Sequence, residues 1–110
     1  MKANELVRRM KMPNPPSVID VRSDSEFKSG HIPGAIHAPN WKIIFKLAKI
    51  PKDKNAELVV LCEMGPRARM SHKILTAFGY RKVDLLDGHM SGWRKARLVI
   101  EKEGCSKQFK

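Results

Sequence analysis

The chain has 110 residues, of which 42% are hydrophobic, and this size and composition fit one domain, residues 1–110, with one core. Two cysteines cannot build a disulfide framework, no apolar run is long enough to cross a bilayer, and the first residues lack the apolar stretch of a signal peptide. We therefore expect a cytoplasmic protein without a membrane contact, in a compartment that keeps thiols reduced.

The formal net charge of +11 is spread along the chain and is not held in one tract. A distributed positive field attracts small anions toward a basic cleft and keeps the surface solvated. The sequence shows no helix-turn-helix, zinc-finger or basic-aromatic pattern, so we expect no specific nucleic-acid binding. No pattern in the sequence indicates an oligomeric state.

An N-terminal helix and a connector are predicted ahead of the first strand. Residues 1–12 are amphipathic, and Asn4 is placed to cap the helix. The prolines that follow predict an extended connector through residue 16, because a residue before proline avoids the helical region. Residues 17–21 are then the first predicted strand.

Polar residues follow this strand closely. Asp20 is expected to accept backbone N–H groups or to pair with Arg22, because a buried carboxylate needs a partner. Residues 22–29 predict a loop with one helical turn, and residues 30–39 predict a compact turn that leads into a short strand. We expect His31 to hold this turn by a hydrogen bond. Neither histidine of the turn has the further ligands that a zinc site requires, so no metal is expected.

The next predicted element is a helix over residues 40–49, with Asn40 as its cap. Its lysines fall on one face and its apolar residues on the other. Trp41 is accordingly predicted to lie in the core. The residues expected on the buried face are Trp41, Ile44, Phe45 and Ala48.

Residues 58–61 are four large apolar side chains in a row, which is typical of a strand buried on both faces of a parallel sheet. Cys62 then lies at the carboxyl end of this strand. Gly65 can adopt the positive φ of a tight loop, and Pro66 suits the first position of a helix. The helix is predicted to run from residue 66 to residue 78.

A strand over residues 82–86 and a helix to residue 97 complete the predicted order, and residues 98–101 are expected to close against the sheet. Residues 102–110 are charged and are expected to form a mobile tail, in which Cys105 is exposed. The alternation of strands and helices predicts an α/β domain, in which ligands bind at the carboxyl ends of the strands.

Cys62 is the candidate nucleophile of this edge. It is expected to face unpaired backbone N–H groups and the positive end of a helix dipole, with the Arg67 guanidinium nearby. All three favour the thiolate, which is the reactive form of a cysteine. The alternative interpretation is a small buried hydrophobic residue, as most unpaired cysteines are.

The hexapeptide at residues 62–67, Cys-Glu-Met-Gly-Pro-Arg, resembles the active-site loop of rhodanese-type sulfurtransferases. Two further segments resemble signatures of that family in the family's order. One is Val-Ile-Asp-Val-Arg at residues 18–22, followed by Glu-Phe at residues 26–27 and Gly-His-Ile-Pro-Gly-Ala-Ile-His at residues 30–37. The other is Leu-Asp-Gly-His-Met at residues 86–90 with Trp93. The resemblance therefore covers residues 18–93.

The resemblance implies a rhodanese-like fold, a central, mostly parallel sheet flanked by helices on both faces. It also implies a sulfurtransferase that moves sulfur from a small anionic donor, thiosulfate or polysulfide, to a thiol or protein-thiol acceptor through a Cys62 persulfide. No metal or organic cofactor is needed, because sulfur is both nucleophile and cargo. Asp20, Arg22 and His31 would support the site. The loop residues that would bind the donor are Glu63, Met64, Gly65, Pro66, Arg67 and Ala68.

Arg67 has two open interpretations: it orients the donor, or it closes the loop through a structural hydrogen bond. Two residues depart from the family pattern, since Glu63 puts a negative charge beside the nucleophile and His89 stands where the family usually has a second glycine. Rhodanese-fold phosphatases and arsenate reductases are the alternative enzymes, but their loops have five residues between cysteine and arginine, whereas this chain has four. A non-catalytic basic binding module is the alternative outside enzymes.

Overall fold

The apolar run at residues 58–61 becomes a central strand, because four large side chains in a row are all buried only between two covered faces of a sheet. The computed structural model describes residues 1–102 and contains a four-stranded sheet in which every strand pairing is parallel. The strands lie in the order β2 (Ile36–His37), β1 (Ser17–Asp20), β3 (Glu57–Leu61) and β4 (Lys82–Leu85). The predicted α/β fold with a parallel sheet is confirmed.

The register of β1 against β3 brings the two strands of the candidate site to one edge. Ser17 lies opposite Leu58, and Asp20 lies opposite Leu61. Because parallel strands end at the same edge, Asp20 and Cys62 are neighbours at the carboxyl end of the sheet. Ligands of open parallel sheets bind at this edge.

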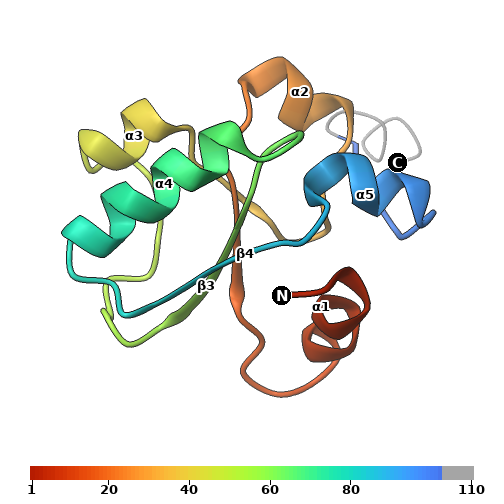
Figure 1. Cartoon of the computed structure of the whole chain (residues 1–110), viewed down its shortest axis with the longest axis horizontal. Coiled ribbons are helices and arrows are strands. Elements are labelled where there is room, and N and C mark those ends of the chain that lie inside the picture. The colour runs from red at the N-terminus through yellow and green to blue at the C-terminus, as the bar shows by residue number, and fades with distance from the viewer. Residues whose placement is uncertain (103–110) are drawn as a thin grey trace, which may run out of the picture.

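Helices cover both faces of the sheet (Figure 1). On one face lie α1 (Ala3–Met10) and α5 (His89–Lys95), and on the other lie α3 (Asn40–Ile44) and α4 (Pro66–Ala77). The short α2 (Asp24–Ser29) follows β1 at the carboxyl edge. Within residues 1–102, no helix combines the length and the apolar composition that a bilayer crossing requires.

The side chains of β3 alternate between two cores. Leu58 and Val60 pack with Leu75 of α4, while Val59 and Leu61 pack with Trp93 of α5. All four strand residues are fully buried. Burial of each contributes about 1.5–3 kcal/mol, so β3 is the part of the sheet that fixes the position of the cysteine that follows it.

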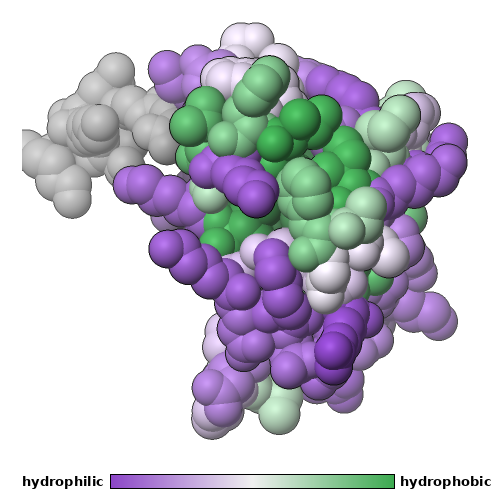
Figure 2. Space-filling view, turned by 90° about the vertical axis from the view of Figure 1, so that its left-hand side faces the viewer, coloured by the Kyte–Doolittle hydropathy of each residue, from purple (hydrophilic) through white to green (hydrophobic). Residues whose placement is uncertain are grey.

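The predicted helix over residues 40–49 is wrong in length and in orientation. α3 ends at Ile44, because Lys46 adopts a positive φ of 59° and turns the chain out of the helix. Ile43 faces the core instead of Trp41, which is 55% exposed, and Phe45 is 70% exposed. Figure 2 looks at the side of the molecule where α3 lies in Figure 1 and shows hydrophobic side chains gathered on its surface. A helix of five residues is too short to place all four predicted apolar residues on one buried face.

Both predicted asparagine caps are also wrong. Lys2 occupies the cap position of α1 without a side-chain hydrogen bond, so Asn4 lies inside the helix. Pro39 occupies the cap position of α3, and Asn40 uses its side chain elsewhere, as described below. Tertiary contacts, not local caps, therefore hold these two short helices.

Residues 98–101 pack beside the sheet without adding a strand to it. Glu101 forms an antiparallel bridge with His31, with N–O distances of 2.7 and 2.8 Å, and Ile100 packs against the core that contains Trp93. The expectations for Cys105 and for most of the tail fall on residues 103–110, which lie outside the described residues.

Candidate active site

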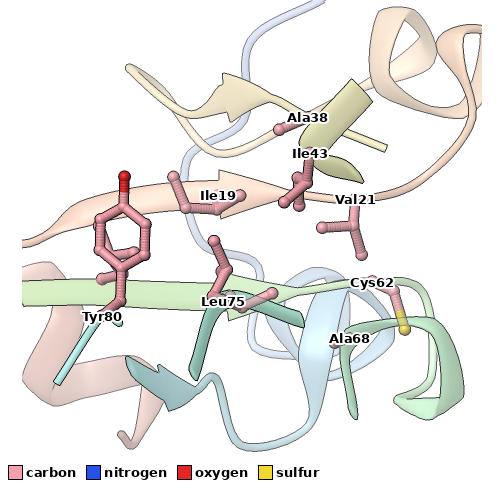
Figure 3. Packing of buried hydrophobic residues seen from close by; sticks show 10 residues of the cluster. Ile19, Val21, Ala38, Ile43, Cys62, Ala68, Leu75 and Tyr80 are labelled. Atoms are coloured by element: carbon pink, nitrogen blue, oxygen red, sulfur yellow. The ribbon is translucent and has the colours of Figure 1, made fainter. Parts of the chain in front are cut away.

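Cys62 follows β3 directly and is 1% exposed. The backbone N–H of Gly65 donates a hydrogen bond to its Sγ over 2.9 Å. Figure 3 shows the sulfur pointing away from the packed core and toward the turn that leads into α4. Of the loop residues predicted to surround the sulfur, the structure thus brings the Gly65 amide to it.

Gly65 can make this contact because its φ is 131°, in a region that side chains strongly disfavour. Pro66 takes the first position of α4, as predicted, and Ala68 is fully buried beneath the loop. Met64 is 76% exposed at the mouth of the loop. α4 therefore begins directly after Gly65, and the unpaired N–H groups of its first turn add positive potential near Cys62.

The base of the loop is held by α5. The N–H of Met90 donates to the carbonyl of Cys62 over 3.0 Å, and the N–H of Ser91 donates to the carbonyl of Glu63 over 3.1 Å. The N–H of Cys62 donates to Nδ1 of His89 over 3.3 Å. Both backbone polar groups of the candidate nucleophile are therefore fixed by one helix N-terminus.

His89 is a site residue that the sequence interpretation treated only as a departure from a glycine. It adopts a positive φ of 52°, and a Cβ placed on Gly65 would lie 3.2 Å from its Nε2. Burial lowers the pKa of His89, the charge of Arg69 lowers it further, and Asp87 opposes the shift. Because Nδ1 accepts the Cys62 N–H, the neutral ring carries its proton on Nε2.

Asp20 and Arg22 form a buried ion pair beside the loop, and their exposed fractions are 0% and 1%. Asp20 accepts the backbone N–H of Arg22 over 3.0 Å and the guanidinium Nη2 over 2.8 Å. Nη2 also donates to the carbonyl of Gly30 over 2.7 Å. The two partners predicted for Asp20, a backbone amide and Arg22, are therefore both present.

Glu63 does not present a free negative charge at the loop. Its carboxylate pairs with the guanidinium of Arg94 from α5, and its Oε1 lies 3.5 Å from Nη1 of Arg22. The conflict expected from a carboxylate beside the nucleophile is thus offset by two cations. Arg94 was not identified from the sequence, where a lysine- and arginine-rich helix end carries no sign of its partner.

Arg67 points at α2. Its Nη1 and Nη2 donate to the two carboxylate oxygens of Glu26 over 2.7 and 3.1 Å. This pair lowers the pKa of Glu26 to about 2 and raises the pKa of Arg67. The carbonyl of Arg67 accepts from Nδ2 of Asn40 over 3.3 Å and from Oγ of Ser71 over 3.0 Å. Of the two interpretations of Arg67, this geometry favours loop closure.

Arg69 is the cation that lies over the loop. Its Nη1 is 3.5 Å from the position of a Cβ placed on Gly65, and its charge acts on the imidazole of His89. No carboxylate within residues 1–102 forms an ion pair with it. Its side chain is exposed to solvent, and nothing in the sequence indicates that it lies beside Gly65.

His31 holds the turn after α2, as predicted. Its Nδ1 lies 2.8 Å from the carbonyl of Phe27, and its ring stacks on the Phe27 ring with centroids 3.8 Å apart. It supports the chain around Gly30, which accepts the Arg22 guanidinium, and it does not reach Cys62 directly. Among residues 1–102, no cluster of three or more histidine, cysteine or acidic residues could bind a metal ion.

The model of the rhodanese-like domain family matches residues 2–96. The chain belongs to this family. Among curated relatives of the rhodanese-like domain, a sulfurtransferase of Allochromatium vinosum is 31% identical over 83 residues, which is 76% of each chain. The thiosulfate sulfurtransferase GlpE of Tolumonas auensis is 35% identical over 75 residues, which is 68% of this chain and 69% of the relative.

Solved structures agree on the fold. The Alr3790 protein from Anabaena superimposes with a TM-score of 0.84 at 21% identity, over 99% of this rhodanese-like domain and 86% of that chain. At that identity the likeness carries the fold alone. The two curated relatives support a sulfurtransferase in general terms for this rhodanese-like domain.

Proposed function

We propose that this chain, as a single rhodanese-like domain, transfers sulfane sulfur from thiosulfate or a polysulfide to a thiol acceptor through a persulfide on Cys62. The observation that carries the proposal is the 2.9 Å contact between the Gly65 N–H and Cys62 Sγ at the start of α4. A hydrogen-bond donor that points at a sulfur atom beside a helix N-terminus stabilises a negative charge on that sulfur. A reducing compartment such as the cytoplasm would keep this thiol available.

The reaction is two successive displacements. The Cys62 thiolate attacks the outer sulfur of thiosulfate, a new S–S bond forms, and the S–S bond of the donor breaks with its electron pair leaving on sulfite. Cys62 then carries the transferred sulfur as a persulfide anion. An acceptor thiolate attacks that outer sulfur, takes it away as its own persulfide and returns the Cys62 thiolate, so no external oxidant or reductant is consumed.

The residues in and beside the loop have separate roles in this reaction. The Gly65 N–H stabilises the negative charge on Sγ before and after sulfur transfer, as in other anion sites built from backbone amides. Arg69, which is free of carboxylate partners within residues 1–102, is proposed to attract the sulfonate or polysulfide end of the donor. Arg67 with Glu26 keeps the loop closed.

The buried position of the thiol supports sulfur transfer over phosphatase or arsenate chemistry. Cys62 is 1% exposed, and four residues separate it from Arg67, so a slender terminal sulfur atom fits the loop better than a tetrahedral oxyanion. The Asp20–Arg22 pair and its contact with Glu63 would hold this small loop rigid.

Intact-mass measurement after incubation with thiosulfate or polysulfide tests the proposal. The native chain should gain one sulfur atom and lose it to a small thiol, and Cys62→Ser should gain none. Cys105→Ser is the matched control, because the chain has two cysteines, and it should load like the native chain. Phosphatase turnover without any sulfur loading would refute the proposal.

A further inference from the structure

The face of α3 carries a group of exposed apolar side chains that neither the fold nor the catalytic loop uses. Their exposed fractions range from 37% for Phe78 to 70% for Phe45. Figure 2 shows this hydrophobic region with hydrophilic side chains around it. We call it the α3 apolar face, and its members are Trp41, Ile44, Phe45, Leu47 and Phe78. Large apolar groups gathered on a surface mark an interaction site more often than scattered ones do.

A pocket of about 260 Å³ continues the α3 apolar face between α4 and the chain that follows α3. Phe78 belongs to both, and Lys46 lies at the rim with its Nζ 5.8 Å from the centre of the Phe78 ring. The apolar lining of the pocket is Ile43, Ala48, Ile50, Leu75, Phe78 and Tyr80. A pocket of this size accepts one large side chain of a partner.

The charges around this pocket are almost all positive. Residues 42–54 contain five lysines and one acidic residue, Asp53. Lys46, Lys52 and Lys54 line the pocket, and the Nζ of Lys54 lies 4.1 Å from the centre of the Tyr80 ring. A partner that fills the pocket therefore needs a negatively charged surface that faces these lysines.

The α3 apolar face also lies next to the catalytic loop. Asn40, the first residue of α3, donates from Nδ2 to the carbonyl of Arg67 over 3.3 Å and accepts from Oγ of Ser71. Trp41 follows Asn40 directly. A protein that binds here is thus placed beside the first turn of α4, within reach of the loop that contains Cys62.

We infer that the α3 apolar face docks an acidic protein whose thiol accepts the sulfur from Cys62. The inference rests on the proposed sulfur transfer and names the partner class for it. A second copy of the chain would bring two lysine rims together, and each copy has a net charge of +11. A flat anionic surface such as a bilayer would satisfy the lysines but would leave the apolar pocket without a side chain to fill it.

The fluorescence of Trp41 provides a binding assay that needs no chemistry. The chain has two tryptophans, and Trp93 is 1% exposed, so a change in emission reports on Trp41. The probe is a synthetic peptide with glutamates around one leucine and one cysteine, titrated into the Cys62→Ser chain. We expect saturable binding that weakens about tenfold in Phe45→Ser and in Lys46→Glu.

Matched controls are Met12→Ser and Lys11→Glu, an exposed apolar residue and an exposed lysine just after α1, on the other face of the sheet. Both should bind the peptide within about twofold of the parent chain. In the native chain, Phe45→Ser and Lys46→Glu should each slow sulfur transfer to the acidic peptide about tenfold while leaving sulfur loading and transfer to dithiothreitol unchanged.

The outcomes separate the two proposals. Peptide binding that depends on Phe45 and Lys46 supports docking at the α3 apolar face, whether or not sulfur loads onto Cys62. A failure of sulfur loading would overturn only the proposed function. Equal peptide binding by Phe45→Ser, Lys46→Glu and the two controls overturns the inference that the α3 apolar face is a docking site. So does stronger binding of an oligonucleotide or of anionic vesicles than of the peptide, or self-association of the chain through the α3 apolar face.

Discussion

Replacing Asp20 by alanine tests the buried ion pair that supports the loop. The substitution removes the Asp20 carboxylate from the guanidinium of Arg22, which is 1% exposed, and leaves it the Gly30 carbonyl and the more distant Glu63 carboxylate, 3.5 Å away. Loss of one partner of a buried pair costs about 3–5 kcal/mol. A domain of this length has an unfolding entropy that turns this cost into a drop in Tm of roughly 13–22 °C. This is a large part of a total stability of about 5–15 kcal/mol.

Urea unfolding near pH 7 measures this cost, with Glu26→Gln as the control for an ion pair at the surface. The control should lose no more than about 1 kcal/mol, because its partner Arg67 is 45% exposed. The double substitution of Asp20 and Arg22 by alanine and methionine should recover part of the loss, since it removes the unpaired charge. If Asp20→Ala costs no more than Glu26→Gln, the buried pair does not stabilise the fold as argued.

Three further predictions concern the loop and its neighbours. The pKa of Glu26 is lowered from 4.5 to about 2, so its pair with Arg67 stabilises the fold above about pH 4.5, and the deficit of Glu26→Gln should shrink as pH falls toward 2 in urea unfolding. Burial lowers the pKa of His89 below 6.5, so the unfolded chain binds the proton more readily and stability should fall as pH drops below 6.5. His89→Gln should reduce this dependence of Tm on pH in thermal unfolding, and an unchanged dependence would contradict the prediction. Gly65→Ala should cost about 1–3 kcal/mol and slow sulfur loading of Cys62, because alanine at a φ of 131° is strained and its Cβ would press on the imidazole.

The sequence identified the features that depend on neighbouring residues. The buried β3, the glycine at position 65 and the proline that starts α4 follow from local apolar pattern and turn chemistry, and the structure places them as predicted. The prediction failed where the local pattern does not decide the structure. Trp41 was predicted in the core because the pattern fits a longer helix, but the positive φ of Lys46 ends α3 early and Ile43 takes the buried position.

The charge pairs of the site show the same limit. Glu26 and Arg67 are 41 residues apart, and Glu63 and Arg94 are 31 residues apart, so no spacing rule connects them. The sequence therefore assigned Arg67 two possible roles and left the charge of Glu63 unexplained. Only the packing of α2 and α5 against the loop shows that each carboxylate has its own guanidinium.

The two hydrogen bonds between α5 and the main chain of Cys62 have a consequence for folding during synthesis. Both main-chain groups of Cys62 bond to residues 89 and 90, which the ribosome adds almost thirty positions later. A nascent chain that ends before α5 contains the whole hexapeptide but cannot yet hold its reactive atom in place. The main chain of Cys62 therefore reaches its final position only after the residues of α5 have been added.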